Sequence, residues 1–389
     1  MRILFIANSN GMAEGSVIAL LSIIAEMRKQ GHEVAALFPD DGEALLKCQE
    51  MQVITYVSKY YNSIYPLYST TKSHLAVPYK IVSNTIQNFI TVKRIISIIR
   101  TFCPDVVHTN VGTVNVGYYA AKYCKVPHVW HIREMAEKNF GWHHLPCLSY
   151  KKRLYSRNSF NIAITNEVFS FYNLQENNSH VVYDGIFKNG VPPLVRLEKE
   201  KYFLFVGRIC EGKGTAWAVD AFLRIKDSYP DYQLLIAGTG GNAYARNLKE
   251  KCRKEIAEGR ILFLGFRRDV YALMQKATAL IVPSELEGFG FITAEAMYNG
   301  CIVIGRNTGG TKEQFDNGKK QTGEEIGLRF ETIDELADKM IEVCRKGVKS
   351  YENMLSKAQR TVMSLYTIEG NVRMILEIYE RQLILSKNL

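Results

Sequence analysis

Strand-like and helix-like segments alternate along most of the chain, and this alternation limits the folds that the sequence can adopt. Short apolar runs, typical of buried strands, are each followed by a segment with apolar residues at helical spacing. Repeated strand–helix units of this kind favour an α/β fold built on parallel sheets. A chain of 389 residues also exceeds what one hydrophobic core usually supports, so two domains are expected.

The first strand–helix–strand unit is expected at residues 1–7, 15–30 and 33–38, and further strands at residues 106–108, 126–131 and 161–165. The loop at residues 8–11 reads Asn-Ser-Asn-Gly and follows the first strand. Ligands bind at this end of the strands in doubly wound sheets. Gly11 is therefore a candidate ligand-binding residue.

A break in the pattern at residues 188–193, Lys-Asn-Gly-Val-Pro-Pro, is typical of a linker. Strand–helix alternation then begins again, with strands expected at residues 202–206, 233–237, 261–264, 279–282 and 301–304, and with helices from residue 333 onward. We predict a first domain over residues 1–187 and a second over residues 188–365. A C-terminal helix over residues 366–389 is expected to pack back on the first domain.

The segment between Glu287 and Glu295, Glu-Gly-Phe-Gly-Phe-Ile-Thr-Ala-Glu, carries the clearest chemical signal. It lies between a strand-like run and a helical pattern, so Gly288 and Gly290 sit at a turn where the backbone can approach a ligand closely. The free N–H groups of the new helix can bind phosphate. Two carboxylates would repel phosphate and are better suited to accept hydrogen bonds from hydroxyl groups. Phosphates flanked by hydroxyl-rich rings describe a nucleotide sugar.

Two further glycine-bearing turns are expected in the second domain. Residues 205–215 contain Arg208 and Lys213, which can converge on one anion through charge-assisted bonds of roughly 1.5–3 kcal/mol each. The P-loop motif is absent from this turn. Residues 307–313, Asn-Thr-Gly-Gly-Thr-Lys-Glu, form the third turn and include Gly310. Each turn alone could be an ordinary structural turn. Three glycine-bearing turns at one edge of the same sheet, however, predict a single ligand-binding crevice.

The net charge of +10 is unevenly distributed along the chain. Residues 51–104 contain six Lys or Arg, no Asp or Glu, and the tyrosines Tyr56, Tyr60, Tyr61, Tyr65, Tyr68 and Tyr79. A basic and aromatic segment suits an anionic membrane surface or a phosphate-bearing acceptor, or it is simply a solvated face. No nucleic-acid-binding motif accompanies it, so a nucleic acid is not expected as a partner.

Targeting signals and disulfides are not expected. The apolar stretch at residues 3–7 is too short for the core of a signal peptide, and no apolar run has the length of a membrane-spanning helix. The eight cysteines include no C-x-x-C pair and are interpreted as reduced structural thiols. We therefore expect a cytoplasmic protein, or one at the inner face of the membrane.

Taken together, the Glu287–Glu295 segment and the turns at residues 207–214 and 309–313 resemble those of the GT-B glycosyltransferases of family 4, most of which retain anomeric configuration. The resemblance spans nearly the whole chain. In the first half it includes residues 31–34, 104–108, 126–134 and 181–186, which are less specific. It implies two Rossmann-like, doubly wound parallel-sheet domains that face a central cleft.

The resemblance also implies residue roles on the donor side. Arg208 and Lys213 would hold the donor diphosphate, Glu295 would accept hydrogen bonds from the ribose, and Glu287 would contact the transferred sugar. Three further residues are expected to border the donor. Backbone N–H groups of Gly290 and Phe291 would face the phosphates or the sugar, and Phe266 would border the base. The donor site is also expected to include Gly11, Gly288, Phe289 and Gly310.

In the first domain the resemblance assigns a catalytic histidine. His131 matches a position that contacts the sugar in such enzymes, with His108 as its rival. A buried structural role for His131 remains an alternative interpretation. His128 and His131 lack a third ligand nearby, so no metal is predicted. Many relatives begin with G-G-x-E where this chain has Asn10-Gly-Met-Ala-Glu14, which leaves the role of Gly11 less well supported.

These observations predict a metal-independent hexosyltransferase that uses a UDP- or GDP-sugar as its donor. The acceptor is expected to be a glycan or a lipid-linked glycan of capsule or lipopolysaccharide synthesis. A nucleotide-sugar epimerase of the same fold and a catalytically silent nucleotide-sugar-binding protein remain alternatives. A dinucleotide-dependent oxidoreductase is disfavoured because residues 8–11 do not supply G-x-G-x-x-G.

Overall fold

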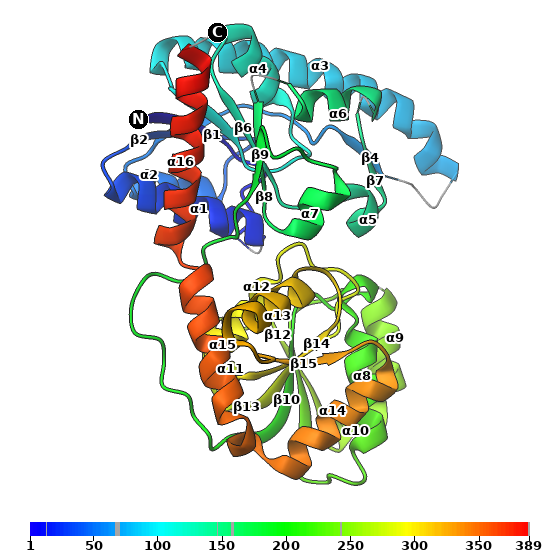
Figure 1. The fold of residues 1–389 in the computed structure, drawn as a ribbon. Coiled ribbons are helices and arrows are strands. Elements are labelled where there is room, and N and C mark those ends of the chain that lie inside the picture. The colour runs from blue at the N-terminus through cyan, green and yellow to red at the C-terminus, as the bar shows by residue number, and fades with distance from the viewer. Residues whose placement is uncertain (13, 67–70, 146, 157–158, 242, 388–389) are drawn as a thin grey trace. The chain divides into compact units, whose positions relative to one another are not determined.

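The computed structural model describes residues 1–389 except 13, 67–70, 146, 157–158, 242 and 388–389, and it divides into two compact units (Figure 1). Unit 1 comprises Met1–Lys188 and Thr367–Leu389, and unit 2 comprises Asn189–Tyr366. Each unit has a parallel sheet with helices on both faces. Among the described helices, none combines the length and the apolar character needed to cross a membrane.

Unit 1 is built on a parallel sheet that has seven strands over the described residues, in the order β3-β2-β1-β5-β6-β8-β9. Their bounds are β1 Arg2–Ile6, β2 Glu33–Phe38, β3 Ile54–Val57, β5 Val106–Thr109, β6 His128–Ile132, β8 Ser159–Ala163 and β9 Ser179–Val181. Ile3 in β1 lies opposite Val34 in β2 and Val106 in β5. Such apolar strands are buried on both faces, as parallel sheets require.

Helices cover both faces of the unit 1 sheet (Figure 1). Their bounds are α1 Gly15–Lys29, α2 Glu43–Glu50, α3 Thr71–Phe102, α4 Val116–Cys124, α5 Ala136–Phe140, α6 Cys147–Leu154, α7 Asn166–Phe171 and α16 Ile368–Lys387. Successive residues of β1 face opposite sides. Ile3 and Phe5 pack in the core beneath α1, α2 and α16, whereas Leu4 and Ile6 pack beneath α3 and α4.

The last helix of the chain, α16, belongs to unit 1. Its apolar residues Val372, Ile375 and Tyr379 are buried in the same core as α1. The backbone N–H of Ile368 donates to the carbonyl of Phe187 at 2.7 Å, which joins the start of α16 to the end of the first part of the chain. Unit 1 is therefore assembled from both ends of the sequence.

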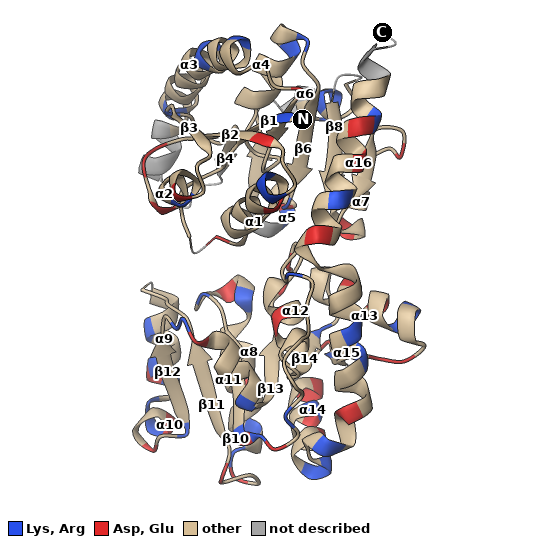
Figure 2. Ribbon diagram, turned by 90° about the vertical axis from the view of Figure 1, so that its left-hand side faces the viewer, with Lys and Arg blue, Asp and Glu red and all other residues tan. Residues whose placement is uncertain are grey.

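A two-stranded antiparallel sheet, β4 Ile64–Pro66 and β7 Trp142–His144, lies outside the large sheet of unit 1. It adjoins the long helix α3, which contains Pro78 and whose lysines and arginines are drawn in Figure 2. Residues 71–102 include no Asp or Glu. Tyr68, part of the basic and aromatic stretch predicted above, lies outside the described residues.

Unit 2 contains a second parallel sheet, with six strands over the described part of the chain, in the order β12-β11-β10-β13-β14-β15. Their bounds are β10 Glu200–Val206, β11 Gln233–Ala237, β12 Ile261–Gly265, β13 Ala277–Val282, β14 Ile302–Arg306 and β15 Leu328–Phe330. The order reverses between β10 and β13. This is the switch point at which doubly wound sheets bind ligands.

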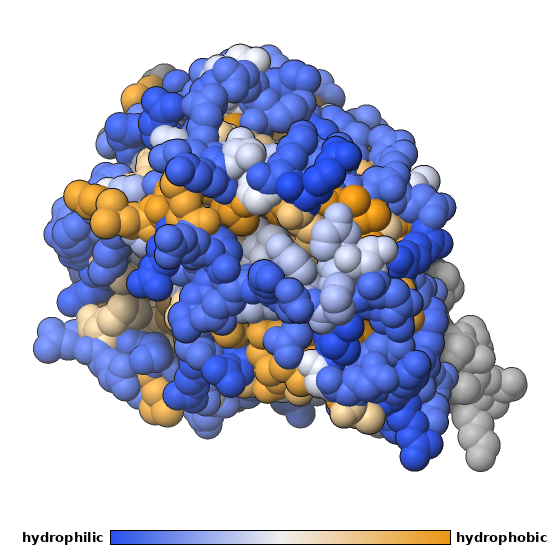
Figure 3. Space-filling model, turned by 90° about the horizontal axis from the view of Figure 1, so that it is seen from below, coloured by the Kyte–Doolittle hydropathy of each residue, from blue (hydrophilic) through white to orange (hydrophobic). Residues whose placement is uncertain are grey.

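The helices of unit 2 enclose its sheet. Their bounds are α8 Thr215–Ile225, α9 Ala243–Lys251, α10 Arg253–Ala257, α11 Val270–Lys276, α12 Phe291–Tyr298, α13 Gly309–Thr322, α14 Ile333–Lys346 and α15 Glu352–Leu365, with 3-10 turns at Glu211–Lys213 and Val348–Tyr351. On the face of the molecule drawn in Figure 3, hydrophobic residues lie in bands between hydrophilic ones.

The prediction of an α/β fold with two doubly wound parallel sheets is confirmed. Strands 33–38 and 233–237 have their expected bounds, but the strand expected at 161–165 is Ser159–Ala163. It ends earlier because Thr165 is the N-cap of α7 and its hydroxyl accepts the N–H of Val168. The short strands β3, β9 and β15 and the two-stranded sheet of β4 and β7 were not predicted.

Candidate functional site

The turns that follow β10, β13 and β14 lie at one edge of the unit 2 sheet, because these strands are neighbours and run parallel. The first turn ends at Gly214, whose φ of +67° favours glycine. A Cβ at Gly214 would lie 2.2 Å from the carbonyl oxygen of Pro283, so the first and second turns touch. The structure thus places these glycine-bearing segments in contact.

Lys213 and Glu287 form an ion pair across two of these turns. The Lys213 ammonium donates to Oε1 and Oε2 of Glu287 at 2.7 Å and 2.8 Å, and the Ser284 hydroxyl donates to Oε1 at 2.6 Å. Both partners are mostly buried, since their side chains are 28% and 14% exposed. The sequence predicted a diphosphate for Lys213 and a sugar for Glu287, and it did not predict this pairing.

Arg208 begins the same turn as Lys213 and is exposed. Among the described side chains, no ion-pair or hydrogen-bond partner of its guanidinium is found. The turn is fixed beneath it by the backbone: the N–H of Ile209 donates to the carbonyl of Thr239 at 2.9 Å. Arg208 is thus a cation held at the sheet edge with its charge open to solvent.

The turn between Glu287 and α12 is held by the beginning of α13. Gly290, with φ of +87°, is the N-cap of α12, so the N–H groups of the first helical turn begin there. The N–H of Gly310 donates to the carbonyl of Glu287 at 2.9 Å. The amide of Gln314 donates to the carbonyls of Phe289 and Gly290 at 2.7 Å and 3.0 Å. The backbone of the turn is therefore rigidly positioned.

The candidate donor residues of unit 2 differ in how far they are exposed to solvent. Phe289 is 2% exposed and packs edge-on against Phe291 and Tyr366, so only its backbone can meet a ligand. Gly288 is half-buried. Phe266, which follows β12, is 67% exposed and is available for a stacking contact.

Glu295 lies on α12, the helix that follows the turn containing Glu287. The Tyr271 hydroxyl donates to its Oε1 at 3.2 Å. Burial raises the pKa of Glu295, and the hydrogen bond from Tyr271 partly opposes this effect. A carboxylate with one bound hydroxyl donor is chemically suited to accept others, as the predicted ribose contact requires.

In unit 1, Gly11 is exposed in the loop that follows β1. The preceding residue, Asn10, fixes this loop: its amide donates to Oδ1 of Asp40 at 2.7 Å, and its Oδ1 accepts the N–H of Leu45 at 3.0 Å. The Gly11 N–H donates to the Ser9 hydroxyl at 3.1 Å. Phosphate binding by Gly11 stays a prediction.

His131 is fully buried at the end of β6. Its Nδ1 lies 3.3 Å from Nε2 of His108 and 3.3 Å from a guanidinium nitrogen of Arg133, and its Nε2 lies 3.9 Å from Oδ1 of Asp184. Burial, the charge of Arg133 and the neighbouring His108 hold its pKa well below the usual value. The complete burial of His131 agrees with the structural interpretation, and its contact with a sugar stays a prediction.

The charge near His131 belongs to Arg133, which sequence reasoning did not single out. Its guanidinium binds the buried carboxylate of Asp184 and donates to the carbonyl of Asn110 at 3.1 Å. His108, also buried, contacts the Tyr379 hydroxyl at 2.5 Å and has its pKa lowered to about 3, mainly by burial. Because Arg133 and Asp184 are far apart in sequence, no local signal indicates their pairing.

Glu134 is a second residue that the sequence did not identify. Burial raises its pKa to about 7, against the charge of Arg133 and backbone hydrogen bonds from Gly112, Thr113 and Arg133. Within the described part of the chain, its buried Oε1 has no hydrogen-bond partner. It follows β6 directly, at the carboxyl end of the unit 1 sheet.

Over the described ranges, no group of three or more His, Cys, Asp or Glu side chains is arranged to hold a metal ion. His128 instead contacts the hydroxyls of Thr109 and Ser159 at 2.9 Å and 3.1 Å. Metal independence itself stays a prediction.

Two Rossmann-like units with parallel sheets, one of them carrying these glycine turns, define the GT-B fold of glycosyltransferases. Residues 191–361 match the family described as glycosyl transferases group 1. This match covers most of unit 2, including every residue of its candidate site. It does not extend to the subdivision called family 4.

Curated relatives that this chain resembles are also glycosyltransferases. One is the lipopolysaccharide core biosynthesis mannosyltransferase LpsB of Rhizobium meliloti, 31% identical over 127 residues, which are 32% of this chain and 36% of that protein. Another, from Campylobacter jejuni, is an N-acetylgalactosamine-N,N'-diacetylbacillosaminyl-diphospho-undecaprenol 4-alpha-N-acetylgalactosaminyltransferase, 30% identical over 138 residues, 35% of each chain. This chain therefore spans about a third of the length of these relatives.

A solved structure extends the likeness to the whole fold. The Anabaena protein HepE in complex with UDP-glucose superposes with a TM-score of 0.72, covering 98% of this chain and 100% of that one at 18% identity. At this identity the likeness shows the fold alone.

Proposed function

We propose that the protein transfers a sugar from a nucleotide diphosphate-sugar donor to a glycan or lipid-linked acceptor. The observation that carries the proposal is the single sheet edge in unit 2, where Arg208, the pair of Lys213 and Glu287, and the start of α12 come together. Cations and a helix N-terminus bind a diphosphate, and carboxylates bind sugar hydroxyls. The family match over residues 191–361 and the UDP-glucose bound to HepE support this donor class.

In the proposed reaction Arg208 and Lys213 bind the diphosphate and stabilise its charge as the glycosidic bond breaks. Glu287 contacts the transferred sugar and, through its bond to the ammonium, also positions Lys213. Glu295 binds the ribose hydroxyls. The bond from C1 of the sugar to the diphosphate breaks, a bond from C1 to the acceptor oxygen forms, and the acceptor proton passes to the leaving phosphate.

We further propose that the reaction retains configuration and requires no metal, as in family 4 of the glycosyltransferases. No carboxylate in the sequence suggests itself as a covalent nucleophile, so a displacement on one face, assisted by the leaving phosphate, is favoured. The positive charges of Arg208 and Lys213 perform the neutralisation that a metal would otherwise supply.

The proposed donor carries UDP or GDP and a hexose, and the proposed acceptor binds mainly to unit 1. Two relatives act in lipopolysaccharide core synthesis and on an undecaprenol-linked substrate, which supports a lipid-linked acceptor in capsule or lipopolysaccharide assembly. The acid-free helix α3 suits contact with an anionic membrane from the cytoplasmic side.

The diphosphate assignment is tested with Arg208→Ala and Lys213→Ala. Each substitution removes one preorganised cation and is expected to lower turnover by about 10²–10³. Lys254→Ala is the control, because Lys254 is an exposed cation on α10 of the same unit. Near-wild-type turnover in the double variant would contradict the assignment.

Donor binding is measured separately with a thermal-shift panel of UDP-, GDP- and ADP-sugars, since ligands stabilise the folded state by mass action. Product analysis then separates the candidate activities. A transferase gives a glycosylated acceptor, an epimerase gives a free isomeric nucleotide sugar, and a silent binding protein gives a thermal shift without turnover.

A further inference from the structure

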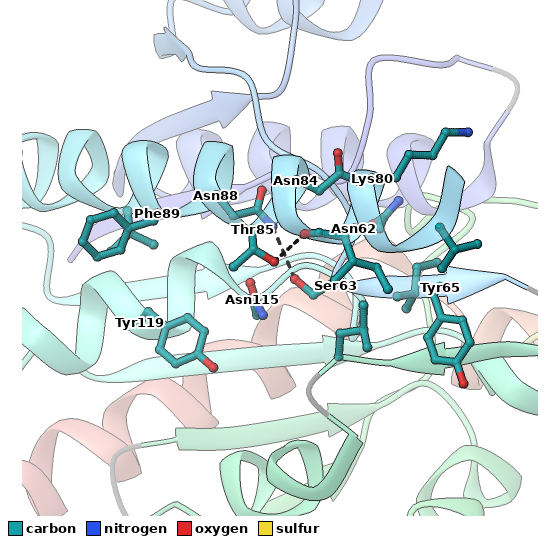
Figure 4. Close-up of a pocket in the computed structure, with 15 residues that line it drawn as sticks. Asn62, Ser63, Tyr65, Lys80, Asn84, Thr85, Asn88, Phe89, Asn115 and Tyr119 are labelled. Carbon is teal, nitrogen blue, oxygen red and sulfur yellow. Dashed lines mark hydrogen bonds between the residues drawn. The ribbon is translucent and has the colours of Figure 1, made fainter. Parts of the chain in front are cut away.

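Unit 1 contains a cavity of about 590 Å³ that lies between α3, α4 and the β4–β7 sheet (Figure 4). The cations and carboxylates of the candidate donor site all belong to unit 2, so they take no part in this cavity. Its wall is formed largely by apolar side chains, among them Ile64, Ile81, Phe89, Val92 and Leu145. Apolar pockets of this size accommodate a ligand rather than a few waters.

Polar residues of the wall are engaged in holding the protein together. Asn88 accepts the N–H of Tyr61 at 2.9 Å and donates to the carbonyl of Tyr61 at 3.0 Å. The Thr85 hydroxyl donates to the carbonyl of Ile81 at 2.7 Å, and Asn62 accepts from the Thr113 hydroxyl at 3.0 Å. The amide of Asn88, the hydroxyl hydrogen of Thr85 and the side-chain oxygen of Asn62 are therefore used in internal bonds. A sugar would have to compete with these bonds, whereas a hydrocarbon would leave them in place.

The cavity has two chemically different ends. In Figure 4, Phe89 and Tyr119 lie at one end, and Tyr65 and Lys80 lie at the other. Lys80 comes from α3, whose residues include five lysines and arginines and no acid. A ligand with an apolar chain and an anionic group matches this distribution of charge.

Next to the cavity, α3 exposes apolar side chains. Val82, Ile86 and Ile90 recur at intervals of four residues and are 58%, 56% and 43% exposed, while Phe89 at the cavity is 60% exposed. Residues four apart share one face of a helix. Contiguous exposed apolar surface of this kind marks a site of contact with lipid or protein. The net positive charge of the helix selects an anionic lipid.

We propose that this cavity binds the hydrocarbon chain of a polyprenyl-phosphate-type acceptor, with Lys80 near its anionic end. The inference rests on the proposed function, because it names the class of acceptor that unit 1 receives. The apolar face of α3 then contacts the bilayer from which the chain enters.

The probe is farnesyl monophosphate, titrated below its critical micelle concentration and followed by calorimetry. Each methylene buried in an apolar site raises affinity by up to about fourfold. Farnesyl monophosphate is therefore expected to bind at least about tenfold more tightly than geranyl monophosphate. Farnesol is expected to bind more weakly than farnesyl monophosphate, and inorganic phosphate is expected not to compete.

Thr85→Trp is the blocking variant, because Thr85 is an exposed residue of α3 that lines the cavity. It is expected to weaken farnesyl monophosphate at least about tenfold. Ser83→Trp is the matched control: it places the same side chain on the same helix, at an exposed residue outside the lining. Lys80→Gln, with Lys151→Gln as its control, is expected to remove the preference for farnesyl monophosphate over farnesol.

Equal affinity of the geranyl and farnesyl probes would overturn the proposal, as would unchanged binding to Thr85→Trp. Competition by a water-soluble oligosaccharide would assign the cavity to a glycan instead and would also overturn it. Failure of the proposed function is read out independently, since donor binding depends on residues of unit 2, whereas the farnesyl probe is titrated in the absence of donor. Chain-length-dependent binding without donor turnover would leave the cavity assigned and the transferase activity rejected.

Discussion

At the scale of single residues, Glu134 links the unit 1 site to pH. Its pKa in the folded protein is about 7, against a usual value of 4.5, because the carboxyl is buried. Between about pH 4.5 and pH 7, the Glu134 carboxyl therefore keeps its proton in the folded state and has lost it in the unfolded state. The free energy of unfolding therefore falls as pH rises from about 4.5 to 7. Above pH 7 the folded state bears the full cost of burying the charged carboxylate.

Glu134→Gln removes that penalty while keeping one acceptor oxygen and nearly the same side-chain shape. We expect the variant to be more stable than wild type at pH 8, by at most about 3 kcal/mol, with the difference vanishing toward pH 4.5. Chemical unfolding across pH 4.5–8 measures it. Glu137→Gln, an exposed carboxylate three residues on, is the control. A pH-independent difference between wild type and Glu134→Gln would refute the assigned ionisation.

Residue types near the unit 2 site could be predicted from sequence, but their pairing could not. Lys213 and Glu287 were each identified because both lie at strand-to-helix turns with glycines. Their ion pair depends on β10 and β13 being neighbours, which no local pattern specifies. For the same reason Arg133 and Asp184 gave no signal, although they form the charged pair beside His131.

At the scale of elements, the start of α13 fixes the Glu287–Glu295 turn. A Cβ at Gly310 would lie 2.1 Å from the carbonyl oxygen of Phe289, and such a contact with backbone cannot be relieved by a side-chain rotation. Gly310→Ala is expected to separate α13 from the turn and to destabilise unit 2 by about 1–3 kcal/mol. Calorimetry should show a lower Tm, by roughly 2–4 °C per kcal/mol.

Gly241→Ala is the control for this substitution, because a Cβ there would meet no atom within 4 Å. Its Tm is expected to match wild type. If Gly310→Ala also melts like wild type, α13 does not hold the turn in the way inferred from the close contact.

Element predictions were good where the apolar pattern was long and poor where it was short. Buried central strands such as β2 and β11 carry continuous apolar runs. The edge strand β3, Ile-Thr-Tyr-Val, is partly exposed along its length, and β15 has only three residues. Helix α3 continues through Pro78, a residue at which sequence rules expect a helix to end or begin.

At the scale of the whole molecule, unit 1 is not continuous in sequence, because all of unit 2 lies between its two parts. The alternation of strands and helices was enough to predict two doubly wound sheets. Unit 1 depends on α16, whose buried Val372, Ile375 and Tyr379 complete a core that also contains α1. Since α16 comes after all of unit 2 in sequence, we expect the folding of unit 1 to require residues 368–387.

A chain that ends at Tyr366 should therefore lose the cooperative unfolding of unit 1 while unit 2 remains folded. Deleting α16 exposes the apolar core beneath it and leaves His108 without its 2.5 Å contact to the Tyr379 hydroxyl. Removing even one buried large side chain typically costs about 2–5 kcal/mol, and α16 contributes several. Calorimetry of the truncated chain is expected to retain one transition, that of residues 189–366 expressed alone.

The matched control reconnects unit 1 without unit 2. The Phe187 carbonyl and the Ile368 N–H are hydrogen-bonded at 2.7 Å, so a flexible Gly-Ser linker of about six residues can join Lys188 to Thr367. This chain is expected to unfold cooperatively, because it restores α16 to its core. If it is unfolded while the full-length protein is stable, unit 1 depends on unit 2 and not on α16 alone. If the chain ending at Tyr366 keeps both transitions, α16 is dispensable and the core that it completes is stable without it.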